Sequence, residues 1–290
     1  MPLPSLPAQL LGILAGLAAA AVWGASDFSG GFATRRNHPV LVLAISTSAG
    51  LAVLTALALL TESQPNTSSG LGWQDIAWSI TAGVCGGVGL VSLYQGLALG
   101  SAAVVSPTAA VIGAAVPVVA GALLEGIPPA VQLSGFMVGI GGIWLVSRSS
   151  QDQSGADGRS MLLAVIAGLG FGGFYVFLGQ VASPQIFAPL AVTKSVQVVL
   201  SLAITAVLRV RIAHRQDVRV ALFSGVLDAG GNTFFLLAQN LTRLDAAAVL
   251  ASMYPAGTVL LSSLILKEKV SRAQWLGVAL CLSAVALIAV

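Results

Sequence analysis

Long apolar runs separated by short polar connections dominate the chain. Residues 10–23, 40–60, 161–178 and 246–266 contain no charged residue. A helix rises about 1.5 Å per residue, so about 20 such residues cross the hydrocarbon core of a bilayer. Strand-length runs of alternating polarity are absent, and a backbone in lipid has to satisfy its own hydrogen bonds. The pattern therefore predicts membrane-spanning helices.

Breaker residues and charges divide the chain into ten such segments. Most connections are short and contain Pro, Gly, Asn or charged residues, whereas longer polar stretches follow residues 61 and 148. We expect helices at residues 9–32, 40–61, 76–99, 103–124, 130–147, 161–182, 188–208, 218–239, 246–266 and 274–290. The predicted fold class is an all-α integral membrane protein.

The two halves of the chain resemble each other at a nearly constant offset. Gly83-Val84 recurs as Gly225-Val226 after 142 residues, and Glu125 recurs as Glu268 after 143. Further matches are Ala102-Ala103-Val104 with Ala247-Ala248-Val249, Gln132 with Gln274, and Gly135 with Gly277. Because five is an odd number, a second copy of five helices has to sit upside down in the membrane. We predict two inverted five-helix repeats, 1–147 and 161–290, joined by a polar linker at 148–160.

Glycines four residues apart predict close packing between helices, because their small size lets two backbones approach. The pairs are Gly12/Gly16, Gly83/Gly87, Gly135/Gly139 and Gly168/Gly172.

Composition and charge support the membrane class and suggest an orientation. Hydrophobic residues make up 57% of the chain and charged residues 8%, against about 25% charged in soluble domains. The basic residues lie in short loops and not on a soluble face, so we expect the membrane surface as partner and no nucleic acid. One side carries Arg35, Arg36, Arg148, Arg159, Arg209, Arg211, Arg215, Arg219, Lys267, Lys269 and Arg272, and the other carries Arg243. The positive-inside rule then makes the crowded side cytoplasmic and places both termini outside.

Three ionisable residues fall inside predicted spans, where charge is costly and usually functional. By helical rise, Asp27 and Asp228 lie about 12–14 Å from the basic side, near the midplane, and Lys194 about 22 Å from it. The two acids are expected to flank one cavity. A carboxylate away from water resists ionisation and could bind and release a proton, or it could be structural. Lys194 either pairs with an acid or extends toward the outer surface.

Other polar and aromatic residues extend this set. Trp23 shares a helix face with Asp27, and Asn232 shares one with Asp228, because each pair is four residues apart. The remaining candidates are Tyr94, Gln95, Tyr175 and Tyr254, with Gln180 and Gln197 also able to hydrogen-bond. Together they predict a polar cavity with aromatic walls, although each alone is often a packing residue or an interfacial anchor.

Common catalytic and cofactor patterns are excluded. The glycine-rich stretch 168–173 fits a dinucleotide fingerprint but lies inside an apolar span, and no phosphate-binding loop is present. Cys85 and Cys281 have no metal or disulfide spacing. His38 and His214 lie in loops without a partner for a catalytic dyad. We therefore expect no enzyme, no cofactor and no metal.

The chain resembles EamA-type members of the drug/metabolite transporter superfamily over essentially its whole length. Trp23-Gly24 resembles the family's opening motif, and Tyr254-Pro255 with Lys267-Glu268 resembles the end of an EamA unit, together with the repeated residues above. One departure is that Ile112 stands where the first repeat would match Pro255. The resemblance implies an inner-membrane carrier working by alternating access that often exports amino acids, metabolites or drugs. Family members are commonly drawn with both termini in the cytoplasm, opposite to the charge bias here.

Two other functions compete with a small-solute carrier. An intramembrane enzyme would need a nucleophile with a base, or a metal cluster, within the spans, and neither histidine is there. A receptor or scaffold that transports nothing fits the same apolar pattern. The sequence leaves the substrate, the coupling ion, the direction of transport and the oligomeric state open.

Overall fold

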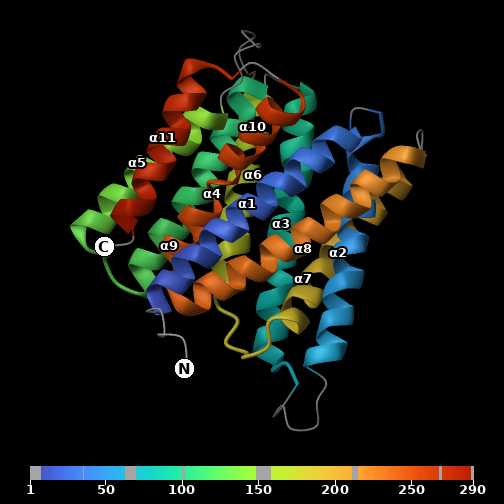
Figure 1. Ribbon diagram of the computed structural model, residues 1–290. Helices are drawn as coiled ribbons and strands as arrows, with labels where there is room; N and C mark the ends of the chain where they lie inside the picture. The colour runs from blue at the N-terminus through green and yellow to red at the C-terminus, as the bar shows by residue number, and fades with distance from the viewer. Residues whose placement is uncertain are drawn as a thin grey trace, which may run out of the picture.

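A computed structural model describes residues 8–34, 36–62, 70–99, 102–147, 158–210, 215–267 and 270–288. These residues form a bundle of helices, and they contain no β-strand (Figure 1). The helices are α1 (Ala8–Thr34), α2 (Pro39–Thr61), α3 (Trp73–Leu99), α4 (Ala102–Leu124), α5 (Ala130–Ser147), α6 (Gly158–Leu178), α7 (Phe187–Val207), α8 (Arg215–Leu241), α9 (Leu244–Ala251), α10 (Tyr254–Ile265) and α11 (Arg272–Ile288).

The lengths and apolar surfaces of these helices suit a bilayer. Eight segments are long and apolar enough to cross a membrane, with α9 and α10 together forming one, Leu244–Ile265. Two shorter apolar stretches, Thr108–Leu124 within α4 and Arg272–Ile288, complete ten. Large apolar side chains stay exposed on the outside of the bundle, among them Leu123 at 82% and Leu282 at 68%. Such a surface is stable against lipid and not against water.

The ten predicted segments are confirmed, with two corrections. The sixth was expected to run to residue 182, but α6 ends at Leu178. The ninth was expected to be one helix over 246–266, but it is broken between α9 and α10. Pro255 explains the break, because its ring has no N–H and clashes with the carbonyl four residues earlier, that of Ala251. The chain turns there through a tighter bond from Met253 N to Leu250 O at 3.2 Å.

The contacts between helices stay the same when each helix of one half is replaced by the corresponding helix of the other half, and we call this the exchange symmetry. It confirms two repeats of five spans. Helices α1, α2, α3, α4 and α5 correspond to α6, α7, α8, the α9–α10 span and α11. Helix α1 packs on α8 as α6 packs on α3, and α2 packs on α8 as α7 packs on α3. Helix α4 packs on α6 as α10 packs on α1. Figure 1 shows α1 and α8 side by side, with α5 and α11 at one edge of the bundle.

The repeated Gly-Val pair performs the same packing task in each repeat. A methyl group on Gly83 of α3 would lie 2.6 Å from the Thr193 carbonyl oxygen of α7. A methyl group on Gly225 of α8 would lie 2.0 Å from the Ser46 carbonyl oxygen of α2. Both distances are shorter than any real carbon contact, so only glycine lets these backbones meet.

The fifth helices of the two repeats are antiparallel partners. Gly135, early in α5, packs against Ile288 at the end of α11, and Gly277, early in α11, packs against Val146 at the end of α5. All eight glycines predicted to allow close packing have a neighbouring helix within 3.1 Å of the position of an added methyl group. The expectation from their spacing is therefore confirmed.

Polar caps fix the ends of the helices that frame the bundle's interior. Pro39 opens α2, and the His38 side chain accepts a bond from Val40 N at 3.3 Å. The Glu62 carboxylate, just past α2, accepts bonds from the backbone N–H groups of Ile186, Phe187 and Ala188 at 2.7–2.9 Å. It thereby caps the N-terminus of α7 and joins the two repeats.

Several predicted features lie outside the described residues. These are most of the linker 148–160, the side chains of Arg215 and Tyr94, and the residues Arg35, Arg148, Arg211, His214, Glu268 and Lys269. The repeat boundaries 1–147 and 161–290 stay a prediction.

We predict that Gly225→Ala destabilises the protein. Its new methyl group meets the Ser46 carbonyl, so α2 and α8 have to separate, at a cost of about 1–3 kcal/mol. Gly141→Ala on α5 is the matched control, because nothing lies within 4 Å of its added methyl group. Thermal unfolding in detergent should show a lower Tm for Gly225→Ala alone. Equal Tm values for the two variants would contradict this packing.

Candidate functional site

A cavity of about 330 Å³ lies between the two repeats. Its described lining comes from the first four helices of each repeat, and along α1 it extends from Trp23 to Thr34. Eleven residues of helix correspond to about 16 Å, so the cavity reaches from the middle of α1 to its C-terminal end. Because this end adjoins the α1–α2 connection, the cavity extends to the side where sequence analysis places most basic residues.

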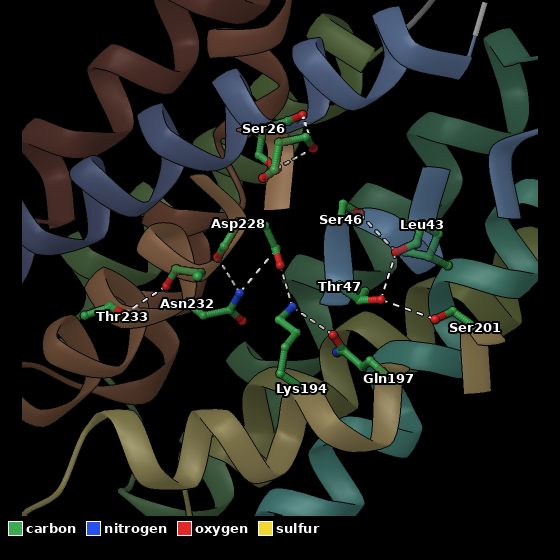
Figure 2. A network of polar contacts seen from close by, with 12 residues as sticks. Ser26, Leu43, Ser46, Thr47, Lys194, Gln197, Ser201, Asp228, Asn232 and Thr233 are labelled. Carbon is green, nitrogen blue, oxygen red and sulfur yellow. Dashed lines mark hydrogen bonds and ion pairs between the residues drawn. The ribbon is translucent and has the colours of Figure 1, made fainter. Parts of the chain in front are cut away.

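An ion pair lines this cavity. The Lys194 ammonium group on α7 donates to the Asp228 carboxylate on α8 and to Gln197 Oε1 at 2.8 Å. Asn232, one turn after Asp228, donates to Asp228 Oδ1 at 3.2 Å. Figure 2 shows Lys194 and Asp228 pointing toward each other from facing helices.

Burial makes this pair mutually dependent. Lys194 is 4% exposed, and its partner Asp228 is half-buried. An ammonium group removed from water needs an opposite charge and further acceptors, and here it has both. The spacing of three between Lys194 and Gln197 places both side chains on one face of α7. The sequence therefore gives the lysine one acceptor on its own helix, and the fold supplies the other.

Asp27 lines the same cavity, but its contacts differ from those of Asp228. Its side chain is exposed to the cavity, and it has no hydrogen bond or ion pair among the described residues. The neighbouring Ser26 exchanges bonds with Ser224 of α8: each hydroxyl donates to the other residue's carbonyl at 2.9 Å. These two hydrogen bonds fix α1 against α8 and hold the Asp27 backbone in place. Asp27 and Asp228 are close enough to interact electrostatically.

Aromatic rings close the cavity at the end opposite Thr34. Trp23, one turn before Asp27, lies 5.9 Å from the Tyr175 ring and stacks on Phe235 at 6.0 Å. Tyr175 and Phe235 are 4.7 Å apart, and Phe174 adjoins both. These four rings belong to a larger buried cluster that includes Leu54, Leu178 and Leu244, each at most 1% exposed. We call this cluster the aromatic seal.

The fold brings most of the predicted site residues together. Seven of the nine line the cavity: Trp23, Asp27, Tyr175, Lys194, Asp228, Asn232 and Tyr254. Gln95 is exposed and is not among the described lining residues, and the side chain of Tyr94 is outside the described part. The helical-rise estimate put Lys194 well outward of Asp228. Its ammonium group reaches Asp228 because a lysine carries its charge on a long flexible stem.

Sequence reasoning missed several polar lining residues. Ser26, Thr47, Ser224 and Ser252 all face the cavity. Ser224 precedes Asp228 by four residues and therefore shares its helix face, which is the one signal that could have identified it. The others resemble the many serines and threonines that bond their own helix backbone, as Ser48 does to Ala44 O.

Comparison with known proteins identifies the family. A model of the EamA-like transporter family matches residues 10–148 and again residues 158–290. A solved structure described only as "Crystal structure of protein" aligns with a TM-score of 0.76 at 18% identity, covering 96% of each chain. An identity this low establishes a shared fold alone. No curated protein matches the chain.

The family match spans nearly the whole chain in two consecutive copies, which agrees with the exchange symmetry of the helices. This chain therefore belongs to the EamA-like transporter family and is a multi-pass membrane transporter of the drug/metabolite transporter superfamily.

Proposed function

We propose that this chain is a secondary transporter that moves a small organic solute, such as a metabolite, an amino acid or a drug, across the cytoplasmic membrane by alternating access. The observation that carries the proposal is the cavity between the repeats, which extends to one side of the bundle and is closed at the other by the aromatic seal. Solute sites between inverted repeats near the midplane recur in secondary transporters.

The exchange symmetry supports two alternating states. Each repeat supplies equivalent helices to the cavity, so interchanging the conformations of the repeats opens the sealed end and closes the open one. Opening the sealed end requires Trp23 to separate from Tyr175 and Phe235, which lie in the other repeat. These ring contacts are worth about 0.5–1.5 kcal/mol each beyond the area they bury, a size that a bound solute can offset.

The two acids are assigned different roles. Asp228 is bound to Lys194 and helps to hold α7 and α8 together. Asp27 faces the cavity without a described partner, so it is the group free to exchange a proton or contact the solute. We therefore assign proton coupling to Asp27 and a positioning role to the Lys194–Asp228 pair.

Charge placement supports the proposed orientation, with the cavity open to the cytoplasm. Arg243 is the basic residue that breaks the charge bias, and it is held by local acids. It pairs with Asp245 at 2.8 Å and lies 3.9 Å from Glu125. Hydrogen bonding to Asp245 raises the pKa of the Arg243 guanidinium above its ordinary value, so it remains charged and paired. The orientation rests on the count of Lys and Arg, and one arginine on the outer side leaves most of the basic residues on the cytoplasmic side.

We expect proteoliposomes containing the protein to move compounds from a mixed amino-acid and metabolite pool, faster under an imposed pH gradient. Asp27→Asn cannot exchange a proton, so its flux should ignore the gradient. Ser283→Ala is the control, because that exposed hydroxyl bonds only within α11. Flux of Asp27→Asn that still follows the gradient would reject the assignment to Asp27. No flux of any compound by folded wild type would reject transport itself.

We expect Lys194→Gln and Asp228→Asn each to destabilise the protein strongly, because either change leaves an unpaired charge in the bundle. Removing one partner of such a pair costs about 3–5 kcal/mol. The double variant removes both charges and should regain most of the loss. Melting curves of the four proteins in one detergent measure this coupling. Losses that simply add would show that the pair does not hold α7 and α8 together.

We expect Thr34→Cys, at the open end of the cavity, to react with a membrane-impermeant maleimide in inside-out vesicles and not in right-side-out vesicles. Cys85→Ala and Cys281→Ala remove the native thiols from this background. Thr61→Cys, exposed at the C-terminal end of α2, should react in the opposite vesicles. Reversed labelling of the two sites would overturn the orientation.

A further inference from the structure

The charges that line the cavity do not balance. Its described acidic and basic residues are Asp27, Lys194 and Asp228, so the lining carries one net negative charge when these three are ionised. Lys194 and Asp228 neutralise each other through direct contact. The remaining charge is on Asp27, which faces the cavity. A solute that occupies the space beside Asp27 is therefore favoured if it is positive.

The one basic residue in the described lining is poorly placed to bind an anion. Lys194 is the one basic residue in the described lining, and its ammonium group is committed to Asp228 and Gln197. A solute carboxylate or phosphate would have to reach a lysine that is 4% exposed and already paired with Asp228, in a cavity that Asp27 also lines. Like charges at such close range are strongly unfavourable where water is scarce. The same conflict disfavours the carboxylate of a zwitterionic amino acid.

The rest of the lining suits an ammonium group attached to an apolar body. Trp23 is one helical turn from Asp27, and Tyr175, Phe171 and Phe174 also line the cavity. An indole or phenol face attracts a cation within about 6 Å and packs against apolar groups. Serine and threonine oxygens around Asp27 can accept further N–H bonds. A volume of about 330 Å³ is at the lower end of small-molecule sites, about 300–1,000 Å³, which favours a small solute.

We propose that the transported solute is a small organic monocation, an amine whose ammonium group binds Asp27 and whose apolar or aromatic part lies against Trp23 and its neighbouring rings. This proposal rests on the transport function proposed above and narrows its substrate to one charge class. Asp27 then selects for a positive solute. Because Lys194 and Asp228 neutralise each other, neither of them offsets the charge of Asp27.

The test uses three probes that share a phenyl ring and differ in charge: 2-phenylethylamine, 2-phenylethanol and phenylacetate. Binding to the full chain in lipid nanodiscs is measured by calorimetry at neutral pH, and flux of the same probes is measured in proteoliposomes. We expect the amine to bind best and phenylacetate worst. Asp27→Asn should weaken amine binding about tenfold to a hundredfold, the effect of losing a charge-assisted hydrogen bond, and leave 2-phenylethanol unchanged.

Asp27→Glu is the matched variant, because it keeps the charge and should keep the preference for the amine over the alcohol. A purely structural role for Asp27 would weaken the amine and the alcohol alike in Asp27→Asn, and that result would overturn the proposal. So would tighter binding of phenylacetate than of the amine. If anions or neutral compounds of the amino-acid and metabolite pool were transported and the amine were not, the proposed positive charge of the solute would be rejected, but the transport function would stand. If the amine bound but no compound were transported, the transport function would be rejected, but the amine-binding site at Asp27 would stand.

Discussion

Close approach of helix backbones at glycine is the constraint on which this bundle depends. Inside a bilayer, an apolar side chain is accommodated by lipid tails as well as it is by a neighbouring helix. The association of helices therefore relies on tight packing. Gly83 and Gly225 bring α3 and α8 against backbone carbonyls of α7 and α2, with one glycine supplied by each repeat. The repeated contact ties each repeat to the other at equivalent points. The cavity side chains are consequently positioned by rigid helices and not by loops.

The Lys194–Asp228 ion pair spans a place where this packing is absent. Helices α7 and α8 touch little through their backbones, and the pair connects them across the cavity. In a low dielectric the attraction is strong, but desolvation of both ions is also costly, so the pair is a poor source of net stability. Its main consequence is electrostatic. By occupying one carboxylate and the one lysine of the described lining, it leaves Asp27 to set the charge of the cavity.

The spans were predictable because their signal is local, whereas the contacts of the site depend on the fold. Apolar runs and polar breaks are enough to locate ten segments, and the 142-residue offset reveals the duplication. The break before Pro255 was missed, because hydropathy does not change across it. The sequence left open whether Lys194 pairs with an acid or extends toward the outer surface. Its partner Asp228 is 34 residues away on another helix, so only the packing of the bundle decides between the two. Ser26 carried no signal, because serines that bond their own helix are common in such segments.

Trp23 connects the candidate site with the proposed change of state. A ligand shifts a conformational equilibrium only by its different affinity for the two states, so a solute must contact something that moves. Trp23 shares a face of α1 with Asp27 and is also a ring of the aromatic seal, stacked on Phe235 of the opposite repeat. A solute bound at Asp27 therefore lies against the ring that has to leave Phe235 before the sealed end can open. This arrangement gives occupancy of the site a direct physical influence on the seal, without a relay through distant residues.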